Sequence, residues 1–216
     1  MRAGDVQVVC VSLVRTADEL AILRETLTDD ERERADRFVF ARDRERYTVA
    51  RAELRRLLAN HLGAPPRICY GAHGKPALVG GGLAFNVSHA HDLGVIAVAC
   101  DREIGVDVER EREVDIAGLA TRYFSPRERE ELLALPDAER LAAFFRCWTR
   151  KEAYVKARGE GLAIPLDAFT VSIGRQTDVT LAADDAARWS LRALDVDPGY
   201  AAAIAVSTGS LHGSIS

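Results

Sequence analysis

Gly94-Val95-Ile96-Ala97-Val98-Ala99 is the stretch that decides the fold, because it is an uninterrupted apolar run. A short run of this kind is typical of a β-strand. A run of the same character, Ala202-Ala203-Ile204-Ala205-Val206-Ser207, recurs near the other end of the chain. Each run follows a long helical segment and a glycine loop. We therefore predict an α+β fold in which two similar α/β halves pack face to face.

Periodicity and capping residues place the other elements. Apolar residues at helical spacing predict a long helix over 42–62. Ser125-Pro126-Arg127-Glu128 is a capping box that opens a helix to about Leu135, and a second long helix is predicted over 137–158. Shorter helices are predicted over 16–23 and 29–40, and strands over 6–14, 94–100, 104–109, 169–173, 189–196 and 200–207. We expect an N-terminal half over 1–103, a C-terminal half over 104–209 and a tail over 210–216.

Composition bounds the class of protein. The chain is 48% hydrophobic and 29% charged with a net charge of −4, which is typical of a globular protein and does not indicate a nucleic-acid partner. The first apolar run, over 6–13, is too short to span a membrane. Four scattered cysteines, Cys10, Cys69, Cys100 and Cys147, indicate free thiols in a reducing compartment, with Cys10 and Cys100 buried. We expect a cytoplasmic protein.

Lysine is rare in this chain. Only Lys75, Lys151 and Lys156 occur among 29 lysines and arginines. Lysine is a compact charge on a flexible stem, whereas arginine is a broad planar fork. A retained lysine therefore marks a place where arginine does not fit, unless it was retained by chance. The segment 32–56 holds nine arginines mixed with acidic residues, which indicates either a solvated helix face or an anion site.

Two further patterns carry possible chemistry. Asp107 and Glu109 alternate along a strand, so both carboxylates project from one face, where they suit a hard divalent ion or the solvent side of an edge strand. Glu152 and Lys156 share a helix face at i,i+4. Either they form an ordinary surface ion pair, or Glu152 is a third metal ligand and Lys156 is a cation beside it. The segment Asn86-Val87-Ser88-His89 offers donors for phosphate oxygens or forms a turn with local side-chain bonds.

In chain order the motifs are Gly74-Lys75-Pro76, Phe85-Asn86-Val87-Ser88-His89, Ile104-Gly105-Val106-Asp107-Val108-Glu109 and Trp148-Thr149-Arg150-Lys151-Glu152-Ala153-Tyr154-Val155-Lys156. The combination resembles the 4′-phosphopantetheinyl transferases of the long, monomeric, surfactin-synthetase-activating type. The resemblance implies a pseudo-twofold axis between the halves and coenzyme A in the cleft between them. It also implies transfer of the phosphopantetheine arm to a serine of an apo acyl or peptidyl carrier protein, with release of 3′,5′-ADP.

The same resemblance implies a role for each matched residue. Asp107, Glu109 and Glu152 would ligate Mg²⁺ or Mn²⁺, and Asp107 would count with Glu152 and Lys156 as catalytic. Glu152 would be the base, directly or through a bound water, and Lys156 would stabilise the reacting phosphorus and the leaving group. The side chains expected to bind coenzyme A are Arg46, Lys75, Ser88, His89 and Lys156.

For the remaining positions the resemblance implies a less specific role. Phe124 would lie where the family meets its carrier domain. Lys151 points to another side of its helix and receives no catalytic role, so Lys151→Arg is expected to be nearly silent. The resemblance leaves open which of four arginines contacts coenzyme A: Arg34, Arg37, Arg42 or Arg44.

Two other functions compete with the transferase. One is a carrier-binding homologue without activity, which predicts a damaged carboxylate set. The other is a Mg²⁺-dependent phosphodiesterase that acts on nucleotides without a carrier. The sequence does not distinguish carriers of nonribosomal peptide, polyketide, siderophore or fatty-acid synthesis. We expect a monomer with neither a nucleic-acid nor a membrane partner.

Overall fold

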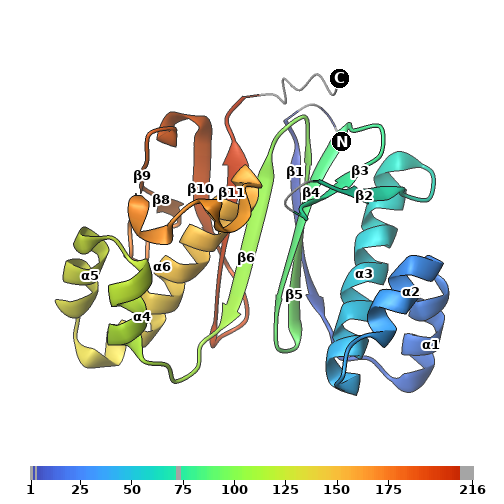
Figure 1. Cartoon of the computed structure of the whole chain (residues 1–216), viewed down its shortest axis with the longest axis horizontal. Helices are drawn as coiled ribbons and strands as arrows, with labels where there is room; N and C mark the ends of the chain where they lie inside the picture. Colours follow the sequence, from blue (N-terminus) through green and yellow to red (C-terminus); the bar gives the residue numbers. More distant parts are fainter. Residues whose placement is uncertain (1, 3, 72–73, 210–216) are drawn as a thin grey trace.

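Two β-sheets face each other at the centre of the molecule, and one long helix covers the outer side of each sheet (Figure 1). This computed structural model describes residues 2, 4–71 and 74–209, so the predicted tail at 210–216 lies outside the described residues. The described elements are mixed α and β with a layered helix–sheet–sheet–helix arrangement, which confirms the predicted α+β fold of two similar halves. No helix in the described ranges is both long and apolar enough to cross a bilayer.

The first half is built around the apolar run at 94–99. β5 is the middle strand of an antiparallel sheet in the order β1-β5-β4. Ile96 and Val98 pack toward the long helix α3, whereas Val95 and Ala97 pack toward the second sheet, so the predicted strand is present and is buried on both faces. The elements of this half are β1 (Val6–Ser12), α1 (Ala17–Glu25), α2 (Asp29–Asp36), α3 (Ala41–Leu62), β2 (Ile68–Tyr70), β3 (Pro76–Leu78), β4 (Leu83–Ala90) and β5 (Leu93–Cys100).

The second half repeats this plan with additions. Its sheet has the order β6-β11-β10-β8, and α6 packs on β6 and β11. The capping box at Ser125 is present, and it opens α5 as predicted. The elements are β6 (Ile104–Arg110), α4 (Ile116–Tyr123), α5 (Pro126–Leu133), α6 (Asp137–Arg158), β7 (Thr170–Val171), β8 (Asp178–Val179), β9 (Leu181–Ala182), β10 (Trp189–Leu194), β11 (Tyr200–Ser207) and the 3₁₀ turns η1 (Gly161–Ala163), η2 (Leu166–Ala168) and η3 (Ala186–Arg188).

The seam between the sheets is an apolar layer that both halves share. Val106 and Val108 of β6 pack there with Val95 of β5 and Ile204 of β11. At the edge of this layer β4 and β6 are joined by side chains. The Asn86 amide oxygen accepts a hydrogen bond from Val106 N at 2.9 Å, and the Ser88 hydroxyl accepts one from Val108 N at 3.3 Å. The Asn86–His89 segment is therefore strand rather than turn, and it aligns the two edge strands.

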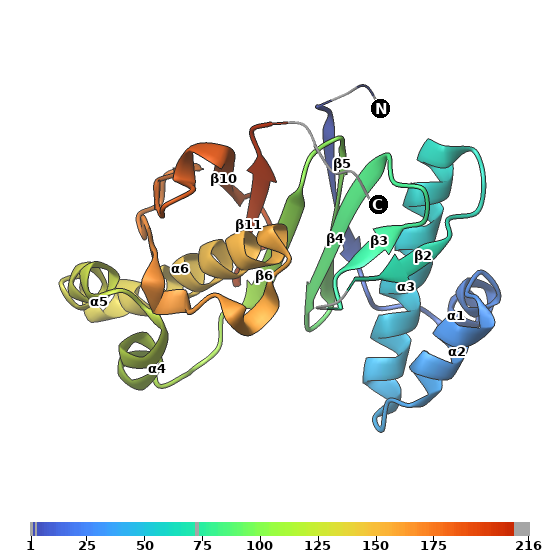
Figure 2. The same ribbon diagram turned by 45° about the horizontal axis from the view of Figure 1, so that its top comes forward.

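The helix α6 approaches β6 very closely at Gly105. A Cβ placed on Gly105 would lie 2.2 Å from Ala157 N and 2.3 Å from Ala153 O, so only glycine fits. The helix ends at Gly159, whose φ of 73° is the left-handed conformation of a helix C-cap. Figure 2 shows α6 running from the α4–α5 side of the second half toward the β2–β3 hairpin of the first half. The C-terminal turn of α6 thus lies at the seam between the two sheets.

Some sequence expectations were wrong. The helix predicted over 29–40 ends at Asp36, and exposed apolar side chains at Val39 and Phe40 follow it. Cys10 is exposed rather than buried, and it lies on β1, an edge strand of its sheet. All four cysteines are free thiols. The strand predicted over 169–173 shrinks to Thr170–Val171, and helix α4 was not predicted at all.

Candidate active site

Two adjoining pockets on the seam share Glu152 and Lys156. One has a volume of about 400 Å³ and is lined by Ser88 and His89 of β4, by Asp107 and Glu109 of β6, and by α6. The other, about 290 Å³, is more apolar; its lining residues include Gly74, Lys75, Pro76, Val155, Ile164 and Leu166. The structure therefore brings together the site residues predicted on four separate segments.

Lys156 is the centre of the first pocket. Its ammonium lies 2.5 Å from Asp107 Oδ1 and 3.0 Å from the Ser88 hydroxyl, which itself donates to Asp107 Oδ1 at 2.8 Å. The three groups form a closed triangle whose members come from α6, β4 and β6. The predicted partner of Lys156 at i,i+4, Glu152, is not its ion-pair partner here. A side chain from each half is thus needed to hold this lysine.

The three predicted carboxylates differ in environment. Asp107 is buried, and its Oδ2 has no hydrogen-bond partner among the described residues. Burial raises the pKa of Asp107, against the charge of Lys156, and Glu109 raises it further. Burial also raises the pKa of Glu152, with the negative charge of Asp107 as the next cause. Glu109 is more open and accepts a hydrogen bond from Arg112 at 2.9 Å.

These carboxylates fit a hard divalent cation by their chemistry. They are oxygen donors, they repel one another, and a buried carboxylate oxygen lacks a partner, which are the conditions that such an ion relieves. They do not form a closed ligand cluster, since within the described ranges no three His, Cys, Asp or Glu side chains converge as a metal centre. Asp107 is not on a solvent face, so the alternative of an exposed edge strand is wrong.

A second cationic group lies at the β4–β5 turn. Arg46, at the start of α3, donates to Asp92 at 2.6 Å and is mostly buried. His89 is exposed at the end of β4, yet its pKa is lowered, first by desolvation and then by the positive charges of Lys156 and Arg46. Arg46, His89 and Lys156 therefore act on one region, as an anion-binding surface requires.

Lys75, directly before β3 in the first half, links the two halves through a contact with α6 of the second half. Its ammonium donates to the Ala157 carbonyl at the C-terminal end of α6 at 2.6 Å, and its stem packs on Gly159. The negative end of the helix dipole favours a cation at this point. Burial lowers the pKa of Lys75 to about 8, against a small opposing effect of Glu103. Lys75 lines the more apolar pocket beside Glu152 and Lys156.

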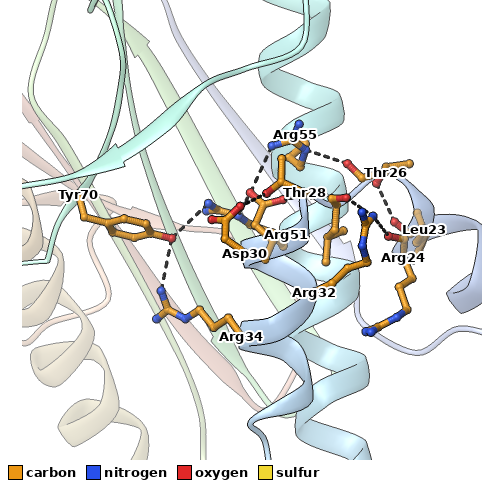
Figure 3. A network of polar contacts seen from close by, with 12 residues as sticks. Leu23, Arg24, Thr26, Thr28, Asp30, Arg32, Arg34, Arg51, Arg55 and Tyr70 are labelled. Carbon is orange, nitrogen blue, oxygen red and sulfur yellow. Dashed lines mark hydrogen bonds and ion pairs between the residues drawn. The ribbon is translucent and has the colours of Figure 1, made fainter.

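The arginine-rich segment resolves into two kinds of side chain. Arg37 and Arg42 are exposed and pair with neighbouring acidic residues. Arg34 instead points to Tyr70, whose hydroxyl also accepts from Arg51, and Figure 3 shows these side chains converging between α2, α3 and β2. Arg34 and Tyr70 line a cavity of about 240 Å³ that reaches Gly74, Pro76 and His89. Of the four candidate arginines, Arg34 is the one whose cavity reaches predicted site residues.

Two expectations about single residues were wrong. Phe124 is 1% exposed and stacks on Phe144 inside the core, so it cannot itself contact a carrier protein. Lys151 is fully buried and pairs with Glu128 at 2.8 Å, so a nearly silent Lys151→Arg does not fit the structure. Sequence reasoning missed Arg112 as the partner of Glu109. No local pattern indicated this pair, because i,i+3 spacing brings side chains together on a helix and Glu109 lies on a strand.

Comparisons with known proteins agree with this site. A family model described as the 4′-phosphopantetheinyl transferase superfamily matches residues 103–205, and one described as the N-terminal part of a 4′-phosphopantetheinyl transferase matches residues 15–101. The chain is 40% identical over 205 residues to the 4′-phosphopantetheinyl transferase HetI of Nostoc sp., an alignment that covers 91% of this chain and 85% of that protein. It is 33% identical over 121 residues to the 4′-phosphopantetheinyl transferase Sfp of Bacillus subtilis, covering 56% and 53%.

A solved structure shows a weaker likeness. The crystal structure of the Thermotoga maritima holo-[acyl-carrier-protein] synthase aligns with a TM-score of 0.39 and 20% identity, covering 49% of this chain and 62% of that one. The sequence relationships decide the class, which is that of the transferases that use coenzyme A. The chain belongs to the 4′-phosphopantetheinyl transferase superfamily.

Proposed function

We propose that this chain transfers the 4′-phosphopantetheine of coenzyme A to a serine of an apo acyl or peptidyl carrier protein. The observation that carries the proposal is the triangle of Lys156, Ser88 and Asp107, which places an ammonium, a hydroxyl and a carboxylate together on the seam. The serine oxygen forms a bond to the phosphorus that carries the pantetheine arm, and the bond from that phosphorus to the ADP oxygen breaks. The products are the holo carrier and 3′,5′-ADP.

Each side chain has a task in this reaction. Lys156 donates hydrogen bonds to the phosphoryl oxygens and the leaving oxygen, where negative charge develops. Glu152 lines both pockets and takes the proton of the incoming serine, directly or through a bound water. The side chains proposed to contact the phosphates of coenzyme A are Arg46, Lys75, Ser88 and His89, with Arg34 as the additional arginine.

We also propose that Asp107, Glu109 and Glu152 hold Mg²⁺, or Mn²⁺ in its place. When bound, the ion neutralises charge on the diphosphate as the bond to ADP breaks. The proposal is supported by the unpartnered buried oxygen of Asp107 and by the mutual repulsion of the three carboxylates. Lys156 already pairs with Asp107, so the ion and the lysine would share that carboxylate.

We further propose that the chain divides into pseudo-repeat halves at 1–103 and 104–209. The matched family models meet near this point, ending at 101 and beginning at 103. Each half also has its own cluster of buried apolar residues between helix and sheet. The chain is proposed to act as a monomer, because both halves of the site lie on one polypeptide.

The test is the mass of a carrier protein after incubation with the enzyme, coenzyme A and Mg²⁺. The carrier is expected to gain the mass of phosphopantetheine, and Glu152→Gln is expected to abolish the gain. Glu139→Gln is the matched control, since Glu139 is an exposed acid on the same helix. No gain with nonribosomal peptide, polyketide, siderophore and fatty-acid carriers would overturn the proposal. Coenzyme A cleavage without a carrier would favour the phosphodiesterase, and carrier binding without transfer would favour an inactive homologue.

A further inference from the structure

Lys151 is the one lysine that the reaction does not use, and its surroundings are unusual. Its side chain is 0% exposed. The ammonium lies 2.8 Å from Glu128 Oε1 and donates to the carbonyl oxygens of Leu166 at 2.7 Å and Phe169 at 2.6 Å. Three acceptors therefore meet the three N–H donors of one ammonium. A buried charge with this complete set of partners is compensated.

Glu128 extends this contact to the body of the second half. One oxygen accepts from Ser125 N at 2.8 Å and completes the capping box of α5. The other accepts from Val171 N at 2.7 Å and from Lys151. The pair thus connects α5, α6 and β7 through one buried point.

The chain between α6 and β7 depends on this point for its position. In the described part of the chain, the backbone–backbone hydrogen bonds recorded for residues 160–168 stay inside the segment, from Ala163 N to Glu160 O and from Ala168 N to Pro165 O. The segment begins after Gly159 and contains Gly161, both with positive φ. Lys151 binds the carbonyl of Leu166 in this segment and the carbonyl of Phe169 directly after it, and so supplies polar links to the core that the backbone does not.

The same segment forms a wall of the more apolar pocket. Gly161, Ile164 and Leu166 line this pocket together with Lys75 and Pro76. Glu152 and Lys156 line it too, so the wall borders the reacting groups. A displacement of the wall changes the shape of the pocket without touching any charged group in it.

We propose that Lys151 is a positioning residue that holds the Gly161–Leu166 wall of this pocket in place for the substrate, and that an ammonium is required because three acceptors converge on one atom. The inference rests on the proposed function, since the substrate in question is coenzyme A. The flat, wider guanidinium of arginine cannot meet three acceptors that surround a single nitrogen. This explains why the position keeps lysine in a chain of arginines.

The experiment separates positioning from folding by removing the whole buried pair. Lys151→Met alone leaves Glu128 charged and buried, so it is expected to fold poorly. The double variant Lys151→Met with Glu128→Gln removes both charges, and the amide of the new side chain keeps one acceptor oxygen for Ser125 N or Val171 N while its NH2 group faces the other. Arg192→Met with Asp178→Asn is the matched control. It removes an exposed ion pair between β10 and β8, at the edge of the second half's sheet that lies opposite β6.

Calorimetric affinity for coenzyme A is the first readout, and hydrogen exchange of residues 160–168 is the second. In the double variant the affinity is expected to fall about tenfold or more, with faster exchange in this segment and kcat at saturating coenzyme A changed much less. Adding Leu166→Ala to the double variant is expected to cost less affinity than Leu166→Ala costs alone, because both act on one wall.

Two results would overturn the inference. One is a folded double variant with the affinity and exchange of the control, which would give the pair a purely structural role. The other is full additivity with Leu166→Ala. Failure of the wild-type chain to modify any carrier would instead overturn the proposed function, and the binding and exchange measurements would still decide the role of Lys151.

Discussion

Replacement of Gly105 by alanine tests whether the contact between β6 and α6 sets the geometry of the site. The added Cβ would lie 2.2 Å from Ala157 N, about 1.2 Å short of the 3.4 Å at which ordinary contact begins. The three nearest atoms, Ala157 N, Ala153 O and Ala157 Cα, all belong to the backbone, so no side-chain rotation relieves the clash, and α6 must move away from the strand. Overpacking costs typically 1–3 kcal/mol, and here we expect about 3 kcal/mol.

The shift reaches the catalytic lysine directly. Lys156 precedes Ala157 and lies 2.5 Å from Asp107 Oδ1, so a displacement of about 1 Å breaks this contact. We expect a fall in Tm of roughly 6–12 °C for a chain of this size and a loss of about 10²-fold in carrier modification. Calorimetry and the carrier mass measurement give the two values. Gly209→Ala is the control, since its added Cβ has no neighbour within 4 Å.

The reasoning would be refuted by a Gly105→Ala variant whose Tm and rate match those of the Gly209→Ala control. A lowered Tm with full activity would refute only the link between the helix position and Lys156. A loss of activity without a loss of stability would mean that the helix moves at little cost.

Four other outcomes follow from the site. Lys156→Arg is expected to lower kcat by about 10²-fold or more, because a planar fork cannot take the place of one nitrogen between Ser88 and Asp107; full turnover would contradict this role. The charged form of Lys75 prevails below its pKa of about 8, so coenzyme A affinity, measured by calorimetry, should fall as pH rises through about 8, and this fall should vanish in Lys75→Met. Mg²⁺ at about 100 times its dissociation constant should stabilise the wild type by about 2.7 kcal/mol in chemical unfolding, and Asp107→Asn should abolish the gain; an equal gain in both would argue against the site. Lys151→Arg should lower the free energy of unfolding by about 2 kcal/mol or more, and an unchanged value would mean that the buried site adapts to arginine.

The fold was predictable where one residue pattern determines one structure. The run at 94–99 predicted a strand, and the capping box at Ser125 predicted the start of α5. The long helix over 137–158 ended at Gly159 as expected, because only glycine readily takes the left-handed cap conformation. Short strands such as β7 and β9 depend on tertiary pairing, so local sequence could not place their ends.

The motifs predicted which residues form the site but not which of them contact one another. The motifs named Asp107, Glu152 and Lys156, and the structure places them together. Helical spacing suggested that Lys156 pairs with Glu152, whereas the partner is Asp107 on a strand that α6 crosses. The burial of Lys151 and Phe124 also depends on which helix face meets the second half, which no local pattern records.

The side-chain hydrogen bonds between β4 and β6 place the site between the two halves rather than inside one of them. Neither sheet alone carries both Ser88 and Asp107, so separation of the halves would dismantle the lysine triangle at once. A ligand gripped by both strands adds its binding free energy to the cohesion of the halves, because it binds only the joined form. Bound substrate would therefore hold the two halves together. The free energy needed to separate the two sheets would rise with the fraction of sites that are occupied.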